Sequence, residues 1–298
     1  MIENAKLGSE SRKRTKRYRT VARHFLCVGN FTLDEVDGEL RPGGSVFYSG
    51  ATAHALGWDV RIVTSASEAF PLSTVRKHLT AEIKLLPSEA TTIMKNVSLW
   101  DERHLWILEK GNRIPATVIP DDWKRDTVVL LCPVFDELDA KSTRSLRGSL
   151  TGASIQGWLR RQDADGRIVC SQSLDFLKWL EGVDVLFFSS EDIREHPDLA
   201  KTLHRAAPIV VETMGSSGVK LTIDGTPWRF SEQRVPVVDT TGAGDTFAAA
   251  FLSYLVAYGD PRDAAKFGLF VAGTKVQKHG PLGKGAIVEF IKNVGTPS

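Results

Sequence analysis

The stretch that decides how this chain folds reads Val237-Val-Asp-Thr-Thr-Gly-Ala-Gly-Asp-Thr246, followed by Phe247-Ala-Ala-Ala-Phe-Leu-Ser-Tyr-Leu-Val-Ala-Tyr-Gly259. Its second half predicts a helix, because aromatic and leucine residues recur at helical spacing with alanines between them. Gly259, followed by Pro261, predicts where that helix ends. Gly242-Ala-Gly244 stands where the helix begins. The uncrowded N–H groups there, with the positive end of the helix dipole behind them, suit an anion such as phosphate.

Asp245 falls in the first turn of the predicted helix and has two interpretations. It could be a general base that activates a hydroxyl beside a γ-phosphate. It could also be a carboxylate that complements the helix dipole, which any helix can carry. The short motif alone slightly favours the second interpretation.

The run from Asp239 to Leu252 resembles the C-terminal signature of the PfkB, or ribokinase-like, family of carbohydrate and nucleoside kinases. The resemblance implies that Gly242, Ala243 and Gly244 form an anion hole and that Asp245 is the catalytic base. It also implies ATP and Mg²⁺ as cofactors and, as in many members of the family, a monovalent cation such as K⁺.

Composition bounds the class of protein. The chain has 298 residues, 42% of them hydrophobic and 25% charged, which suits one large α/β domain or two ordinary ones. No apolar run is long enough to span a bilayer and no secretory signal stands at the N-terminus, so we expect a cytoplasmic protein. Cys27, Cys132 and Cys170 match no zinc spacing and are expected to be free thiols in a reducing compartment.

Basic residues are concentrated at the N-terminus. Residues 1–23 hold eight Lys and Arg against two Glu, although the net charge of the whole chain is only +2. This segment could touch nucleic acid or an anionic surface. We favour a solvated extension ahead of a kinase domain at 24–298, because a short basic run without a recognition fold is common. Neither nucleic acid nor a membrane is expected as a partner.

The resemblance also implies an α/β fold in which a central, mostly parallel sheet carries helices on both faces. Short apolar runs at 24–29, 127–132 and 184–188 predict buried strands of such a sheet. Residues 35–47 and 91–114 alternate and contain β-branched or aromatic residues, which predicts a small separate sheet. By resemblance this sheet is a lid that keeps water from the γ-phosphate, and it could also form a homodimer face.

On the side of the acceptor, the family pattern is only partly kept. Asp34 follows the first strand and matches a family Asp that holds substrate hydroxyls, although a turn aspartate is the alternative. Gly43 and Gly44 match a glycine pair that lies against the sugar. Tyr48 stands where the family usually has a substrate-orienting Asn, and Gln156 begins an element that reads Asp-x-Asn-x-Arg in many sugar kinases. We therefore expect Tyr48 and Gln156 to contact the substrate in a non-standard pocket.

On the side of the donor, Thr213, Gly215 and Gly218 resemble the nucleotide-phosphate loop of the family. Gly280 stands in a loop that borders the adenine in relatives. These positions predict where ATP binds.

Ser189 and Asp192 stand where the family has Asn-x-x-Glu, which organises Mg²⁺ and its waters. Their oxygens suit Mg²⁺, but a serine N-cap with acidic residues in the next helical turn fits the same pattern.

The predicted reaction is transfer of the γ-phosphoryl group of ATP to a hydroxyl of a small polyhydroxy substrate, a sugar or a polyol such as inositol. One alternative is a nucleoside kinase of the same family. Another is a non-catalytic nucleotide-binding or regulatory protein that keeps the fold.

Overall fold

The computed structural model of the protein describes residues 22–283 and 285, apart from 37, 100–101, 140–143, 145, 147, 149 and 232–234. The basic segment, for which the sequence predicts a solvated extension, lies almost entirely outside the described residues. Among the residues that are described, no helix combines the length and the apolar character needed to cross a membrane.

The core of the fold is a nine-stranded sheet. From β5 to β13 neighbouring strands run parallel, and only β14 and β15 at one edge run antiparallel. The predicted mostly parallel sheet is therefore confirmed. Across the sheet the strands are β15 (Thr226–Phe230), β14 (Val219–Ile223), β13 (Ile209–Thr213), β12 (Val185–Ser189), β9 (Leu150–Ser154), β8 (Thr127–Leu131), β1 (His24–Val28), β4 (Asp59–Ala66) and β5 (Ala81–Pro87).

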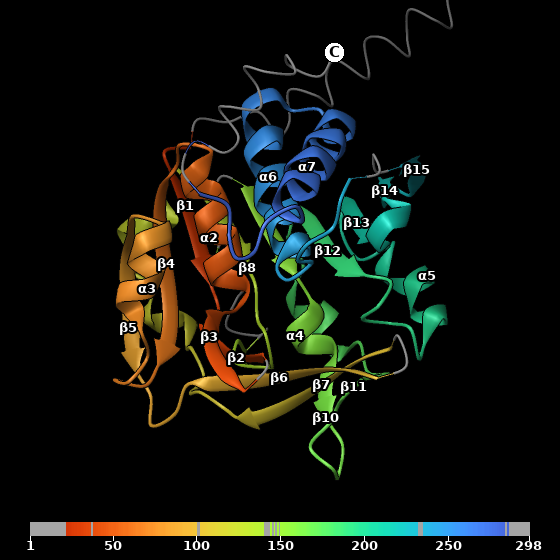
Figure 1. The fold of residues 1–298 in the computed structure, drawn as a ribbon. Coiled ribbons are helices and arrows are strands. Elements are labelled where there is room, and N and C mark those ends of the chain that lie inside the picture. The colour runs from red at the N-terminus through yellow and green to blue at the C-terminus, as the bar shows by residue number, and fades with distance from the viewer. Residues whose placement is uncertain are drawn as a thin grey trace, which may run out of the picture.

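Both faces of this sheet are buried. In β1, Phe25 and Cys27 belong to one buried cluster, while Leu26 and Val28 belong to another. Strands buried on both faces appear in sequence as continuous apolar runs, which is why these strands are predictable. Helices α2 (Ser45–Ala55), α3 (Leu72–His78), α6 (Ala243–Tyr258) and α7 (Pro261–Lys275) pack on the first cluster, and the one-turn helices α4 (Gln156–Leu159) and α5 (Ala200–Leu203) on the second. Figure 1 shows α2, α6 and α7 in front of the sheet.

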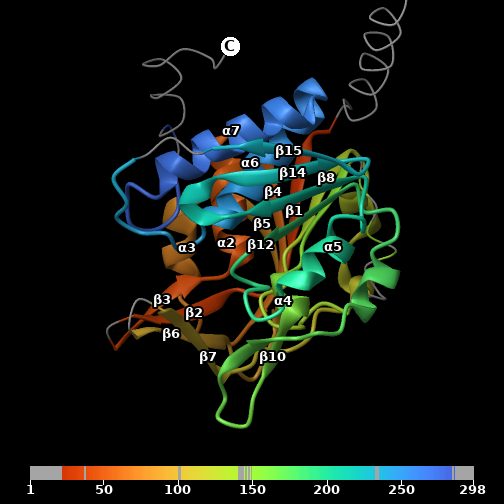
Figure 2. The ribbon, with the colours of Figure 1, turned by 90° about the vertical axis from the view of Figure 1, so that its right-hand side faces the viewer.

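A separate four-stranded sheet lies at one end of the body in both ribbon views (Figures 1 and 2). We call it the lid sheet. Its strands, in the order in which they lie, are β3 (Glu39–Gly43), β2 (Thr32–Val36), β6 (Thr92–Leu99) and β7 (Glu102–Glu109). The first segment begins earlier than the predicted 35–47 and ends at Gly43, because Ser45 already starts α2. A short ribbon of β10 (Arg160–Gln162) and β11 (Ile168–Cys170) touches β7 through the bridge between Trp106 and Arg167.

The two edges of the large sheet differ. At one edge β14 and β15 form a hairpin on Asp224-Gly225, whose φ values of +45° and +82° fit the two-residue turn that such dipeptides favour. The outermost strand of this hairpin carries Pro227, opposite Thr222. At the other edge β5 presents alternating exposed and half-buried residues.

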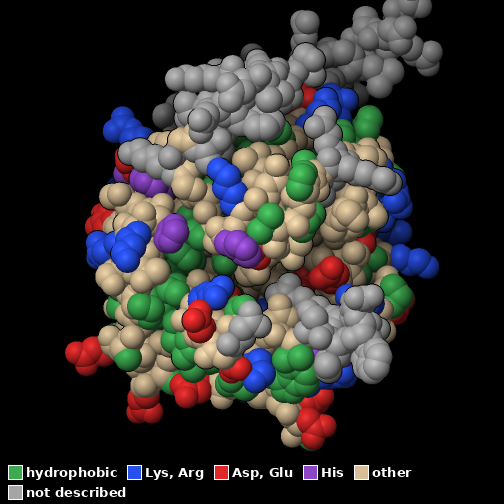
Figure 3. Space-filling model, in the orientation of Figure 1, with side chains coloured by type: hydrophobic (Ala, Val, Ile, Leu, Met, Phe, Trp, Pro, Cys, Tyr) green, Lys and Arg blue, Asp and Glu red, His purple; other side chains and the backbone are tan. Residues whose placement is uncertain are grey.

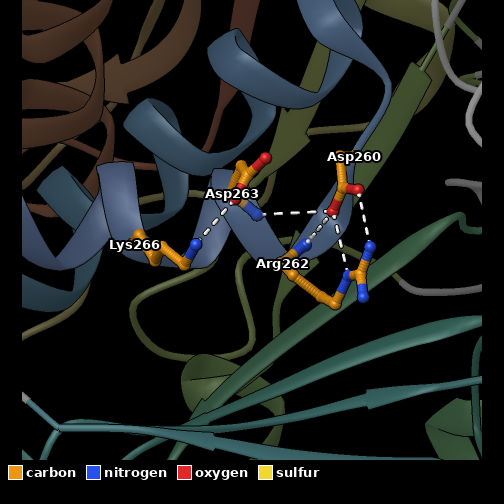
Figure 4. Close-up of polar contacts among 4 residues, drawn as sticks. All are labelled: Asp260, Arg262, Asp263 and Lys266. Atoms are coloured by element: carbon orange, nitrogen blue, oxygen red, sulfur yellow. Dashed lines mark hydrogen bonds and ion pairs between the residues drawn. The ribbon is translucent and has the colours of Figure 1, made fainter. Parts of the chain in front are cut away.

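Helices α6 and α7 are joined by a sharply defined turn. Gly259 caps α6 with a φ of +82°, as predicted, and Asp260 starts α7. The Asp260 carboxylate accepts hydrogen bonds from the backbone N–H groups of Arg262 at 2.8 Å and Asp263 at 3.4 Å (Figure 4). Such a cap contributes about 1 kcal/mol to helix stability. The far end of α7 reaches the cleft described below.

Charge on the described surface is mixed. On the face seen in Figure 3, Lys and Arg side chains are interspersed with Asp and Glu side chains. That face therefore carries no field of positive charge of the kind that binding to nucleic acid requires.

Candidate active site

A large cleft lies where the lid sheet, the end of the parallel strands and the first turns of α2 and α6 meet. Its volume is about 1640 Å³, more than the roughly 300–1,000 Å³ that one drug-sized ligand usually fills. The cleft therefore has room for a phosphoryl donor and an acceptor together. All the site residues predicted from the sequence line it except Gly43, which lies behind Asp34.

The first turn of α6 builds the predicted anion hole. Gly242 is the N-cap, with a left-handed φ of +73°, and its carbonyl accepts from the N–H of Thr246 at 2.9 Å. Ala243 donates its N–H to the Thr240 carbonyl at 3.1 Å and so closes the loop. A Cβ placed on Gly244 would meet no other described part of the chain within 4 Å. The open side of the loop is therefore at Gly244, where an anion fits.

Tyr48 forms the wall behind this loop. A Cβ on Gly242 would overlap the Tyr48 ring, so both the positive φ and the ring require glycine at that position. The Tyr48 side chain lines the cleft, but the residue is only 6% exposed. Tyr48, expected to contact the acceptor, thus also contacts the loop that would hold the donor phosphate.

Asp245 follows in the same helical turn. Burial raises the pKa of its carboxyl group to about 6, against the lowering effects of a hydrogen bond from Ser45 and the charge of Arg160. The neighbouring carboxylates of Asp192 and Asp34 raise it further. A carboxylate that only complements a helix dipole would have a lowered pKa. A raised value near neutral pH suits a general base, so the geometry favours the first interpretation of Asp245.

A relay of hydrogen bonds leads to Asp245 from the opposite wall. Arg160 donates to the Gln156 Oε1 atom at 3.0 Å, and Gln156 Nε2 donates to the Ser45 Oγ atom at 2.8 Å. The Ser45 hydroxyl in turn bonds the Asp245 carboxylate. Gln156 therefore acts on Asp245 through one residue.

Ser45 and Arg160 were missed in the prediction. Their signals were present in the sequence, since Ser45 follows the glycine pair and Arg160 keeps the Arg of the Asp-x-Asn-x-Arg spacing. Both residues line the cleft.

Asp34 lies on the lid sheet, within β2, and not at the end of the first strand as the sequence suggested. The Thr32 hydroxyl donates to its Oδ1 atom at 2.8 Å. A Cβ on Gly43 would overlap the Asp34 carboxylate. Gly44 has a φ of +96° and lies against the Asn30 carbonyl, where it starts α2. The glycine pair thus makes room for Asp34 and for the turn into the helix.

The predicted phosphate loop for the nucleotide follows β13. Thr213 ends that strand, and the turn is closed by a bond from the Met214 N–H to the Gly218 carbonyl at 2.8 Å. Gly215 and Gly218 both have positive φ values. Across the cleft, Gly280 donates its N–H to Asp239 Oδ2 at 3.1 Å. Gly280 is therefore tied to the start of the α6 loop.

Ser189 and Asp192 belong to one turn after β12. The Ser189 N–H donates to Asp192 Oδ2 at 2.9 Å, and the Ser189 Oγ accepts from the Glu191 N–H at 3.2 Å. Turns, and not a helix, follow this strand, so the helix-cap alternative is wrong. Within the described ranges no three acidic, His or Cys side chains form a metal cluster. Mg²⁺ often binds one or two carboxylates and keeps its waters, so Asp192 beside bound phosphates fits such an ion.

Comparison with known proteins agrees with this geometry. The family model described as pfkB family carbohydrate kinase matches residues 158–284. A cytidine kinase of Thermococcus kodakarensis is 26% identical over 253 residues, which cover 77% of this chain and 87% of that protein. A ribokinase of Lactococcus lactis is 24% identical over 198 residues, covering 65% of this chain and 63% of that protein.

Solved structures show the same fold. A pyrophosphate-dependent kinase in the ribokinase family, complexed with a pyrophosphate analog and myo-inositol, superposes with a TM-score of 0.76 and 22% identity over 89% of this chain and 99% of that one. A ribokinase of Thermotoga maritima superposes with a TM-score of 0.68 and 17% identity, over 92% and 100% of the two chains.

Proposed function

This chain belongs to the PfkB, or ribokinase-like, family of kinases, and we propose that it transfers the γ-phosphoryl group of ATP to a hydroxyl of a small polyhydroxy acceptor. The observation that carries the proposal is the pairing of Asp245 with open space over Gly244 in one helical turn. A base and an anion site are then adjacent, as phosphoryl transfer needs.

In the proposed reaction, Asp245 takes the proton of the attacking hydroxyl as the acceptor oxygen bonds the γ-phosphorus. The bond between that phosphorus and the bridging oxygen breaks, and ADP leaves. The amides at the start of α6 and its dipole stabilise the charge on the transferred group. Arg160 adds a positive charge close to the base. Mg²⁺, held near Asp192 through water, would neutralise charge on the donor phosphates.

A nucleotide donor is supported by the apolar residues at one end of the cleft. Val237 and Val238 are 62% and 50% exposed, unusual for valine. They line the cleft together with Val276 and Pro281, next to the phosphate loop. Apolar surface beside an anion site suits a nucleobase attached to phosphates.

A sugar or polyol such as inositol is the preferred acceptor. Asp34, Gln156 and Arg160 line the other end of the cleft with carboxylate, amide and guanidinium groups. Such groups pair with the several hydroxyls of a polyol. A nucleoside is the second candidate, because Phe47 and Met94 line the same wall and could contact a base.

The test is coupled ADP release by the purified protein across a panel of sugars, polyols and nucleosides, with the Asp245→Asn variant as the background. We expect saturable turnover with at least one polyhydroxy compound. Turnover with nucleosides alone would favour the second candidate. Unimpaired ATP binding without turnover on the whole panel would favour the non-catalytic alternative.

We further propose a cytoplasmic location and a homodimer formed through the lid sheet. Cys27, Cys132 and Cys170 are free thiols, as in a reducing compartment. Leu40 and Leu108, on β3 and β7 of the lid sheet, are each 50% exposed. The solution mass of wild type and of Leu108→Glu, measured by light scattering, tests the dimer. A monomeric wild type would exclude it.

A further inference from the structure

Lys275, the last residue of α7, is buried beneath the loop that starts α6. Its side chain is 0% exposed, and it ranks among the largest fully buried side chains of the described residues. Burying an ammonium group is costly unless it is paired and hydrogen-bonded. The position of this charge therefore calls for a physical explanation.

The ammonium group is bound by one residue through two oxygens. Lys275 Nζ donates to the Asp239 carbonyl at 2.9 Å and lies 3.2 Å from the Asp239 Oδ2 atom. Nζ also lies 5.5 Å from the centre of the Tyr48 ring, at cation–π distance. A carbonyl, a carboxylate and an aromatic face thus surround the cation.

Asp239 connects this cation to both sides of the donor site. Its Oδ1 accepts from the Thr241 N–H at 2.9 Å, and its Oδ2 accepts from the Gly280 N–H at 3.1 Å. Burial raises the pKa of Asp239, but the bonds from Thr241 and the charge of Lys275 outweigh it, so the pKa lies below its usual value. The carboxylate is therefore held ionised, and it draws the α6 loop and the Gly280 loop together.

The end of α7 holds the same loop through its backbone. The Val276 carbonyl accepts from the N–H groups of Val238 at 2.7 Å and Asp239 at 3.1 Å. Tyr48, whose ring contacts Gly242, is the ring that faces Lys275. Lys275 is therefore one aromatic ring away from the anion hole, and its charge also acts on Asp245.

We propose that Lys275 is a built-in cation that holds the Asp239–Gly242 loop in its anion-binding form, so that the protein needs no added monovalent cation. This inference rests on the proposed kinase function. It identifies Lys275 as a positioning residue, because the structure places it behind the loop and not against the donor. The K⁺ expected from the family resemblance would then have no role, since the oxygens of Asp239 already bind the ammonium group.

The first experiment uses the unaltered protein. Turnover and ATP affinity, the latter by calorimetry without acceptor, are measured in K⁺, NH₄⁺, Na⁺ and tetramethylammonium salts at equal ionic strength. We expect both quantities to agree within about twofold across the salts, since the loop is already held. A stimulation of ten-fold or more by K⁺ or NH₄⁺ would overturn the inference and leave the kinase proposal intact. If no acceptor turned over, the ATP affinities would still test it.

The second experiment compares two replacements of the buried lysine. Lys275→Ala leaves room for a small cation, whereas Lys275→Met fills most of the space with an uncharged chain. We expect each to lower kcat by about 100-fold, the cost of a misplaced site. Millimolar NH₄⁺ or K⁺ should restore Lys275→Ala by at least ten-fold and leave Lys275→Met unchanged. A purely structural role predicts equal behaviour of the two in every salt, and that result would refute the proposal.

A matched control lies on the same helix. Lys266 is half-exposed and pairs with Asp263 at 2.9 Å in the first part of α7 (Figure 4). Lys266→Met removes a lysine charge from α7 far from Asp239 and should keep wild-type turnover. Circular dichroism and thermal melting establish that each variant is folded. Should neither Lys275 variant fold, the salt series on the wild type decides alone.

Discussion

Replacing Gly242 by alanine should unfold the start of α6 more readily than any other single methyl addition in the motif. Gly242 has a φ of +73°, where an L-residue pays about 1 kcal/mol. The new methyl group would also overlap the ring of Tyr48. Overpacking of this kind costs roughly 1–3 kcal/mol. Together these effects predict a loss of about 2–4 kcal/mol from the free energy of unfolding.

Gly244→Ala, two residues on, is the matched control for this prediction. A Cβ there meets open space, and the residue lies inside the first helical turn. Alanine favours a helix over glycine by roughly 0.5–1 kcal/mol, so Gly244→Ala should be as stable as wild type or slightly more stable. Its methyl group would nevertheless stand where the phosphoryl group is expected. We therefore expect weaker ATP binding and lower turnover from this variant alone.

Urea unfolding monitored by circular dichroism measures both free energies, and calorimetry measures ATP affinity. Tyr48→Ala combined with Gly242→Ala completes a double-mutant cycle. Because the small side chain at position 48 removes the overlap, the cost of Gly242→Ala should fall to about 1 kcal/mol in that background. If Gly242→Ala kept wild-type stability, or if the cycle showed no coupling, the contact between the ring and the loop would be wrong.

The remaining predictions concern Asp245. Asp245→Asn should abolish turnover and leave ATP affinity nearly unchanged, and a turnover near that of wild type would exclude Asp245 as the base. With the pKa of this carboxyl at about 6, kcat/KM should be constant above that pH and fall about tenfold per pH unit below it, because only the ionised form accepts a proton; a profile that stays flat down to pH 5 would contradict the assignment. Ser45→Ala removes a hydrogen bond that lowers the pKa of Asp245, so the acid limb should move up by about one pH unit, and a profile identical to that of wild type would show that Ser45 does not reach the base.

Local patterns in the sequence were sufficient for much of the fold. The continuous apolar runs of β1, β8 and β12 predict buried parallel strands because both of their faces are covered. The end of α6 at Gly259 and the hairpin at Asp224-Gly225 follow from backbone conformations that few other residues adopt. Each of these features is decided by residues that are neighbours in the chain.

The site could be predicted only where its residues are neighbours. Gly242, Gly244 and Asp245 share one helical turn, so their spacing fixes their geometry. The relay from Gln156 to Ser45 joins positions 111 apart in sequence, which no local pattern encodes. Lys275 has the same limitation, because a lysine in the last helical turn ordinarily points to solvent and stabilises the dipole. Only its packing against Asp239 and Tyr48 gives it another role.

The position of Asp34 shows the same limit in another form. Its spacing from the first strand is the same whether the chain stays in the large sheet or leaves it. The chain leaves it, and Asp34 travels with β2. A substrate held by Asp34 would therefore bind the lid sheet to the body, so that acceptor binding and lid closure become a single event.

The edges of the large sheet have a consequence for how these molecules behave at high concentration. An open sheet can add a strand from another molecule wherever its outer strand offers free backbone donors and acceptors. Here β15 carries Pro227, which lacks an N–H group, and β5 carries Glu82, Lys84 and Pro87. Proline and charge at both margins oppose fibre-like growth, so the sheet should stay closed to self-association even when the lid sheet is used for pairing.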